Sequence, residues 1–251
     1  MLTKTGIVLD QVEINRRIKE KNLKNWELEC YQSFRDNILD KEHPYPCYFA
    51  VEAEKKGLSR YIFVQSTTED ELLRLRDGLY EYIKTYRNIG KRTTLVTFFK
   101  PPKEVVYAEY YKGQFWKVLQ FLMEHDPEPW PRDIPTDPNH PKWEYCFGGE
   151  PIFVVCRAPI YHARKSRYTS NGLEITFQPR GTLDDITGDT PRGQQVREMI
   201  RARLKQYDAI PPHPDIGDYG APDKREWKQY ILPDTNEESV MRCPLKKEHS
   251  R

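Results

Sequence analysis

The sequence predicts an α+β domain in which a mostly antiparallel sheet is flanked by three long helices and connected by long proline-rich loops. Two patterns support this class. Long runs with apolar residues every three or four positions predict helices, and short runs of aromatic and β-branched residues predict strands. These runs follow the order hairpin, helix, strand, helix, hairpin, helix, which is typical of an α+β arrangement.

The first half of the chain is predicted to contain a helix, a hairpin and a second, long helix. Residues 24–39 carry apolar side chains at four-residue spacing, which predicts an amphipathic helix. Residues 47–53 and 60–65 are rich in aromatic and β-branched residues and are joined by "KKGL", so we expect the two strands of a hairpin. Residues 66–90 begin with a capping-box pattern and end at a glycine, as a long helix does.

The second half is predicted to complete the sheet and to add two further long helices. Residues 93–99 form a strand pattern, and residues 103–126 have the spacing of an amphipathic helix. Residues 151–156 and 173–178 predict two more strands, the second with alternating apolar positions. Residues 188–207 contain a threonine followed by a proline, which suits a helix N-terminus, and then a helical apolar stripe.

The remaining segments are irregular. Six prolines between residues 127 and 141 exclude regular structure there, and the proline-rich segment 208–236 carries aromatic residues that are expected to anchor it to the body of the domain. We treat residues 1–251 as one domain, because a chain of this length can bury a substantial core. About residues 1–22 and 241–251 are expected to be peripheral or flexible.

Composition excludes several classes of function. Forty basic and thirty-eight acidic residues give a net charge of +2, so the overall charge does not indicate a nucleic-acid partner. The alternative is local binding of nucleic acid through the basic stretches 157–167 and 197–205. No apolar run approaches the roughly 18 to 20 residues of a membrane span, so we expect no membrane partner. The five cysteines contain no C-x-x-C pair, which speaks against a zinc site and favours the reducing cytoplasm. No G-x-G-x-x-G is present, so no NAD site is expected.

No two histidines have the i, i+4 spacing of a metal site on one helix. A cofactor that needs only one histidine ligand is still compatible with the sequence. Haem needs a neutral imidazole for its iron, an apolar slot for the ring and cations for its propionates. His162, in "APIYHARKSRYTS", has Arg164, Lys165 and Arg167 after it and Arg157 just before the stretch, and is one candidate ligand. The alternative is that this connection is simply a solvated basic turn.

A second candidate ligand lies in "HPYPCYFA". His43 is held by two neighbouring prolines at the entrance of the first predicted strand, where a stiff backbone would preorganise a ligand. The alternative is a strand entrance stiffened by proline and nothing more. Cys47 could supply a thiolate, but a cysteine that starts an apolar strand is more often a buried small apolar residue.

Two further clusters have both a functional and a structural interpretation. Asp184 and Asp185 could bind a cationic substrate, or could lead the loop into the next helix. Trp227 and Lys228, in "REWKQYILPD", have the chemistry to stack on a flat ligand and to pair with its carboxylates. The same residues could instead pack the C-terminal segment.

Taken together, several motifs resemble the YqcI/YcgG family. They are "HPYPCYFA", "FWKVLQFLMEHDPEPWP", "FGGEPIFVV", "HARKSR" before "LEITFQPRGTLDD", and "YDAIPPHPDIGDYG" before "REWKQYILPD". The resemblance covers roughly Trp26 to Asp234. The family is named for uncharacterised bacterial proteins, and members in antibiotic and toxin pathways are haem-dependent N-hydroxylases that act on arginine or a related guanidino compound.

The resemblance implies haem b with a histidine axial ligand, for which His43 and His162 are the alternatives. It assigns Arg164 and Arg167 to the propionates, and Trp227 and Lys228 would complete the cofactor site. A guanidinium substrate requires a carboxylate fork, for which the candidates are Asp184, Asp185 and Glu150.

The resulting hypothesis is a cytoplasmic haem-dependent monooxygenase that transfers one oxygen atom to the nitrogen of a small metabolite, of arginine, guanidino or amine type. Its partners would be the small-molecule substrate and an electron donor or peroxide, and a homodimer is left open. The alternative is a non-catalytic protein of the same fold that binds haem or a small anion.

Overall fold

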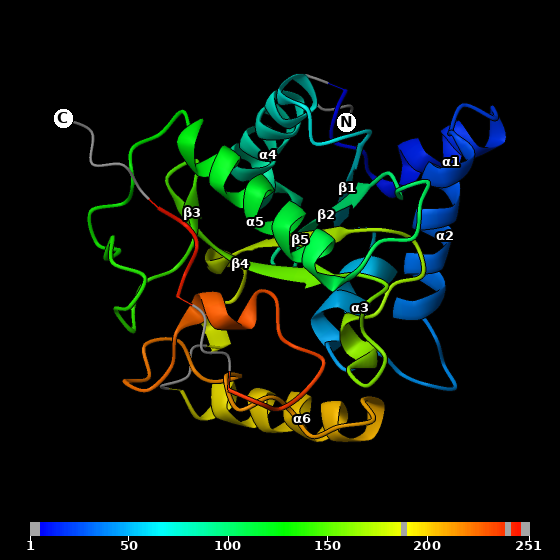
Figure 1. Cartoon of the computed structure of the whole chain (residues 1–251). Helices are drawn as coiled ribbons and strands as arrows, with labels where there is room; N and C mark the ends of the chain where they lie inside the picture. Colours follow the sequence, from blue (N-terminus) through cyan, green and yellow to red (C-terminus); the bar gives the residue numbers. More distant parts are fainter. Residues whose placement is uncertain (1–5, 187–189, 239–241, 247–251) are drawn as a thin grey trace.

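The computed structural model describes residues 6–186, 190–238 and 242–246 (Figure 1). Its centre is a five-stranded sheet in the order β1-β2-β5-β4-β3. The strands are β1 Ser59–Val64, β2 Thr94–Phe99, β3 Cys146–Phe147, β4 Glu150–Arg157 and β5 Glu174–Pro179. β1 and β2 are parallel, and the other three neighbouring pairs are antiparallel. The fold is therefore a mixed α/β one, and the predicted hairpin of β4 and β5 is present.

Six α-helices surround the sheet in the described part of the chain. They are α1 Gln11–Lys19, α2 Asn25–Ile38, α3 Tyr48–Lys55, α4 Glu69–Ile89, α5 Ala108–Glu124 and α6 Pro191–Tyr207. In Figure 1, α4 and α5 lie on one side of the sheet, and α2, α3 and α6 lie on the other. Short 3-10 turns, η1 Lys165–Arg167, η2 Arg180–Thr182, η3 Asp184–Ile186 and η4 Glu226–Gln229, join the later elements.

The two faces of the sheet pack differently. On the α4 and α5 side, alternate residues of the strands, such as Val154, Ile175 and Phe177, are fully buried in one large apolar cluster. On the other side, α1 and α2 cover the β1 and β2 end, where Tyr61 and Phe98 are buried in a second cluster. This second cluster does not extend over β4 and β5, and that part of the sheet lies opposite α6.

Helix α6 begins as predicted but packs loosely. Thr190 is its N-cap and accepts a hydrogen bond from the backbone N–H of Gly193, and a proline occupies the first turn. The apolar stripe of Val196, Ile200 and Leu204 faces the sheet but is only half-buried. A helix whose apolar face is not filled by protein atoms leaves space for a ligand. The predicted start of this helix at residues 188 and 189 lies outside the described residues.

The predicted hairpin of residues 47–53 and 60–65 is wrong. Residues Tyr48–Lys55 form α3, and β1 pairs with β2 in parallel rather than with a preceding strand. Phe49, Ala53 and Glu54 are buried, at positions that share one face of a helix, whereas Val51, which a strand would place on the same face as Phe49 and Ala53, is only half-buried. The helix α1 was not indicated by the sequence, although Ile14 within it is fully buried.

Candidate functional site

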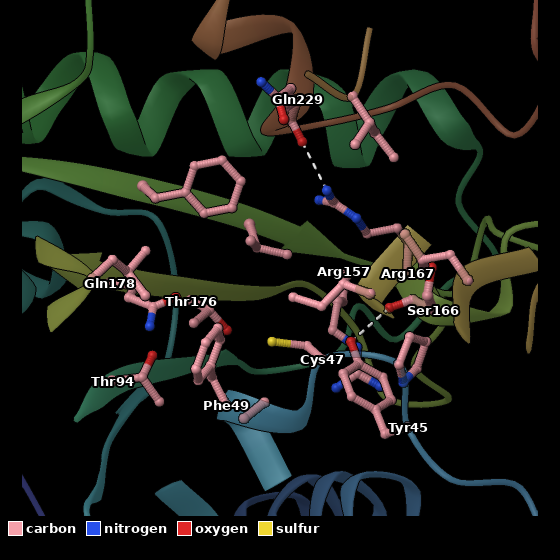
Figure 2. Close-up of a pocket in the computed structure, with 18 of the residues that line it drawn as sticks. Tyr45, Cys47, Phe49, Thr94, Arg157, Ser166, Arg167, Thr176, Gln178 and Gln229 are labelled. Atoms are coloured by element: carbon pink, nitrogen blue, oxygen red, sulfur yellow. Dashed lines mark hydrogen bonds between the residues drawn. The ribbon is translucent and has the colours of Figure 1, made fainter. Parts of the chain in front are cut away.

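A cavity of about 330 Å³ lies between α6 and the exposed end of the sheet (Figure 2). This volume lies near the lower end of the range of small-molecule sites. Three kinds of element supply its walls: the strand residues Val96, Val155 and Thr176, the α3 residue Phe49, and the α6 residues Ile200 and Leu204. The walls are mainly apolar, and the polar groups gather at a few defined points.

Cys47 is a sulfur donor that points into the cavity. It is the N-cap residue of α3, and Figure 2 shows its Sγ directed into the open space near Phe49 and Thr176. Burial raises the pKa of the Cys47 thiol, while the backbone N–H groups of Ala50 and Phe49 oppose that effect. A thiol at a helix N-terminus is a favourable position for a thiolate once a metal ion compensates its charge. Because residues 48–55 form a helix and not a strand, Cys47 lies at a helix N-terminus, where it is suited to bind a metal ion as a thiolate.

A buried ion pair closes the floor of the cavity beside α2. Arg157 Nη1 lies 2.9 Å from Glu174 Oε1, and the two residues are 3% and 1% exposed. The Arg157 guanidinium also lies over the rings of Phe34 and Tyr45. Burial raises the pKa of Glu174, and the neighbouring Arg157 counteracts it. The second carboxylate oxygen of Glu174 has no hydrogen-bond partner among the described residues.

Arg167 provides a positive charge that no carboxylate neutralises. Its guanidinium donates hydrogen bonds to the carbonyl oxygens of Gln229 at 2.8 Å and Tyr230 at 3.1 Å (Figure 2). Within the described ranges, no Asp or Glu oxygen lies within ion-pair distance of it. Arg92, at the other side of α3, is instead paired with Asp185 at 2.8 Å. Arg167 is thus the cavity residue best placed to bind an anionic group.

Acidic residues gather at the opposite end of the cavity. Glu144, from the segment before β3, and Glu226, from η4, both bind the guanidinium of Arg180 at the end of β5. The Arg180–Glu226 distance is 3.4 Å. The ring of Tyr219 lies against the other side of Arg180, with its centroid 3.6 Å from the guanidinium carbon. All four residues line the cavity.

The two histidines predicted as iron ligands lie outside the cavity. The His43 side chain is 78% exposed and lies 3.6 Å from Asp40. His162 is exposed, and its backbone N–H donates to Asp234 at 2.8 Å. No histidine lines the cavity among the described residues, and His249 lies outside them. The structure therefore brings neither histidine to the space that a ligand could occupy.

The predicted basic and aromatic partners are divided between the cavity and the core. Arg167 lines the cavity, but Arg164 is buried against the C-terminal segment, where it donates to the Pro233 carbonyl at 3.0 Å. Trp227 is buried in the large apolar cluster. Lys228 lies 3.8 Å from Asp215 and does not line the cavity.

The predicted substrate carboxylates do not line the cavity either. Asp184 is exposed in η3. Asp185 lies between Arg92 and Lys91 at 2.8 and 3.0 Å. Glu150 binds Arg87 at 2.7 Å. Asp185 and Glu150 have structural partners, whereas Glu144, Glu174 and Glu226 are the carboxylates that the fold directs to the cavity.

Sequence reasoning missed most of the residues that line the cavity. One signal was readable: Glu174, Thr176 and Gln178 alternate with apolar residues in the predicted strand 173–178, so β5 has a polar face, and that face lines the cavity. Glu144 and Glu226 carried no comparable signal because they lie outside the predicted helices and strands.

Two features are absent from the described residues. No group of three or more His, Cys, Asp or Glu side chains is arranged to hold a metal ion. None of the helices in these residues is both long and apolar enough to cross a membrane.

Comparison with known proteins gives a consistent set of relatives. A sequence model described as "YqcI/YcgG family" matches residues 34–246. The uncharacterised proteins YcgG and YqcI of Bacillus subtilis (strain 168) are 39% identical over 236 residues and 38% identical over 235 residues. The match covers 91% of this chain and 91% of YcgG, and 92% of this chain and 91% of YqcI.

A third relative has a name that includes an activity. The protein named "Putative N(omega)-hydroxy-L-arginine synthase DcsA", of Streptomyces lavendulae, is 31% identical over 229 residues, which cover 89% of this chain and 85% of DcsA. No solved structure matches the chain.

Proposed function

The chain belongs to the YqcI/YcgG family, and from this premise we propose that it is an N-hydroxylase of a small guanidino or amine metabolite, with haem b as its cofactor. The relative named as an N(omega)-hydroxy-L-arginine synthase, matched over most of both chains, supports N-hydroxylation. The structural observation that carries the proposal is the Cys47 thiol, which points into a largely apolar cavity with charged groups at its ends.

The residues of the cavity fit the requirements of haem. The ring needs apolar walls, the iron needs a donor atom and the propionates need cations. Phe49 and Ile200 belong to the apolar walls, Cys47 supplies a sulfur donor, and Arg167 supplies a positive charge without a carboxylate partner. We therefore assign the iron ligand to Cys47 in place of the exposed His43 and His162.

Bound haem would supply oxygen activation, and a thiolate ligand favours cleavage of the O–O bond. With O2 as oxidant, one oxygen atom converts an N–H bond into N–OH, while two electrons and two protons from a donor convert the other atom into water. With hydrogen peroxide no electron donor is needed, because the second oxygen leaves as water.

The chain itself has three tasks in this reaction. The backbone N–H groups at the start of α3 stabilise negative charge on Cys47 Sγ. The half-buried apolar face of α6 excludes water when the cavity is filled. The polar groups at the ends of the cavity orient the substrate so that its nitrogen, and not a neighbouring carbon, meets the oxidant.

The test is reconstitution with haem followed by product analysis. The loaded protein is incubated with L-arginine, agmatine and simple amines, with either a reductant and O2 or hydrogen peroxide. We expect a product heavier by one oxygen atom, with the hydroxyl on nitrogen, as determined by mass spectrometry with labelled oxygen. A loaded protein that produces no N-hydroxylated product from any guanidino or amine compound would contradict the proposal.

A second candidate is non-catalytic binding of haem or another small anion by the same cavity. The observation that favours it is Arg167, whose charge is not balanced by a carboxylate. This candidate predicts stoichiometric binding that depends on Arg167, without turnover under any of the conditions above.

A further inference from the structure

The acidic end of the cavity contains more carboxylates than cations. Glu144 is fully buried and Glu226 is 6% exposed, and both share the single guanidinium of Arg180. Arg197 is near but already engaged, because its Nε lies 2.8 Å from Asp218 and its Nη1 donates to the Ile186 carbonyl. With both glutamates ionised, this end of the cavity lacks one positive charge.

The hydrogen bonds at this end are also incomplete. Oε1 of Glu144 is buried and has no hydrogen-bond partner among the described residues. A buried carboxylate oxygen without a donor is energetically unfavourable, and a ligand that donates to it removes that penalty. A planar guanidinium has paired N–H donors that match carboxylate oxygens, and it can engage two carboxylates at once.

We propose that Glu144 and Glu226 form the recognition site for the guanidinium group of the substrate. This inference rests on the proposed function for the identity of the cavity as the substrate site, and it adds which residues select a guanidino compound over a neutral one. Glu144 accepts hydrogen bonds through its buried, unpaired Oε1, and Glu226 supplies the charge that balances the ligand. Arg180, held between Tyr219 and the glutamates, is a positioning residue that keeps the carboxyl groups apart.

The site is expected to exchange a proton when it binds a cation. Burial, together with the negative charge of Glu144, raises the pKa of Glu226 to about 8. The other charged or titratable groups that face Glu226 are Arg180, Arg197, Tyr219 and Tyr230. Near neutral pH, the Glu226 side chain is therefore mainly protonated in the free protein. A guanidinium ion lowers this pKa, so binding releases close to one proton.

The test is titration calorimetry at about pH 7 in buffers of different ionisation enthalpy, with L-arginine and agmatine as guanidinium probes. L-citrulline, which has the shape of L-arginine with a neutral urea group, is the comparison ligand. We expect the guanidinium probes to bind about 10- to 100-fold more tightly than L-citrulline, as charge-assisted hydrogen bonds imply. We also expect the release of close to one proton per guanidinium bound.

Glu226→Gln is the main variant because it keeps the size of the side chain. It should weaken guanidinium binding about 10-fold or more and abolish the proton release. Glu128→Gln is the matched control, since Glu128 lies outside the cavity and binds Lys84 at 2.8 Å. Glu144→Gln should weaken binding too, and a thermal melt with a single cooperative transition will show that each variant is folded.

Equal binding of L-arginine and L-citrulline, no binding of either guanidinium probe, or proton release that survives in Glu226→Gln would each overturn the inference. These outcomes are separable from failure of the proposed function. Guanidinium binding through the two glutamates without N-hydroxylation would contradict only the proposed function. N-hydroxylation that is unaffected by Glu226→Gln would contradict only the assignment of the recognition site.

Discussion

The variant Glu226→Gln should make the protein more stable at high pH. Glu226 is buried beside Glu144, and its pKa rises from the usual 4.5 to about 8 in the folded protein. A raised pKa in the folded state contributes stability that is fully present below about pH 4.5 and is lost as the pH rises through about 8. Glutamine does not ionise, so the variant does not lose this stability.

The size of the effect follows from the same two pKa values. A separation of about 3.5 pH units corresponds to an upper bound of about 5 kcal/mol at about 1.4 kcal/mol per unit. Because Glu144 shares the proton and Arg180 opposes the shift, we expect about 2 to 5 kcal/mol. For a protein of this size, each kcal/mol raises the melting temperature by about 2 to 4 °C.

The assay is urea unfolding of the wild type and of Glu226→Gln at about pH 5, 7 and 9. We expect nearly equal free energies of unfolding at about pH 5 and a growing advantage of the variant at higher pH. Glu128→Gln serves as control, because Lys84 lowers the pKa of the half-buried Glu128, and removal of this carboxylate should not stabilise the protein. Parallel pH profiles of the wild type and Glu226→Gln would refute the reasoning.

Two further predictions concern the floor and the roof of the cavity. Glu174→Gln should destabilise the protein by about 3 to 5 kcal/mol, because it leaves the buried Arg157 without its carboxylate. Urea unfolding should show that the double variant Glu174→Gln/Arg157→Met recovers part of this lost stability. Ile200→Ala, on the half-buried face of α6, should lower the free energy of unfolding by less than about 1 kcal/mol. Phe177→Ala, in the filled core, should lower it by about 3 to 5 kcal/mol. Equal losses in the two variants would show that α6 packs tightly on the sheet.

Local patterns predicted the elements whose side chains pack in a regular periodicity. The long helices α4 and α5 and the strands β2, β4 and β5 appear where the apolar spacing places them. Residues 48–55 were different, because their aromatic side chains favoured a strand locally while burial of Phe49 and Ala53 on one side stabilises a helix. The parallel pairing of β1 with β2 joins two strands that are separated in the sequence by the whole of α4, so no local stretch of sequence contains both of them.

The candidate site was less predictable than the fold. The sequence favoured a buried structural role for Cys47, because its segment was expected to be a strand. In the structure Cys47 lies instead at the N-terminus of α3, where a thiolate ligand is favourable. The alternation of polar and apolar residues in β5 predicted a polar face. That this face lines a cavity could not be predicted, because the cavity exists only where α6 packs loosely over the sheet. Glu144 and Glu226 meet at Arg180 only through the course of irregular segments, which have no periodicity to interpret.

The most direct test of the central claim is the absorption spectrum of the haem-loaded protein, recorded oxidised, reduced and with carbon monoxide, for the wild type and Cys47→Ser. Cys243→Ser is the matched control, since Cys243 is half-buried away from the cavity.

We expect one haem per chain, a reduced carbon monoxide complex with the long-wavelength band of thiolate ligation, and loss of that band in Cys47→Ser but not in Cys243→Ser. A wild-type spectrum of histidine ligation that disappears in His43→Ala or His162→Ala, or a well-folded protein that takes up no haem, would contradict the account.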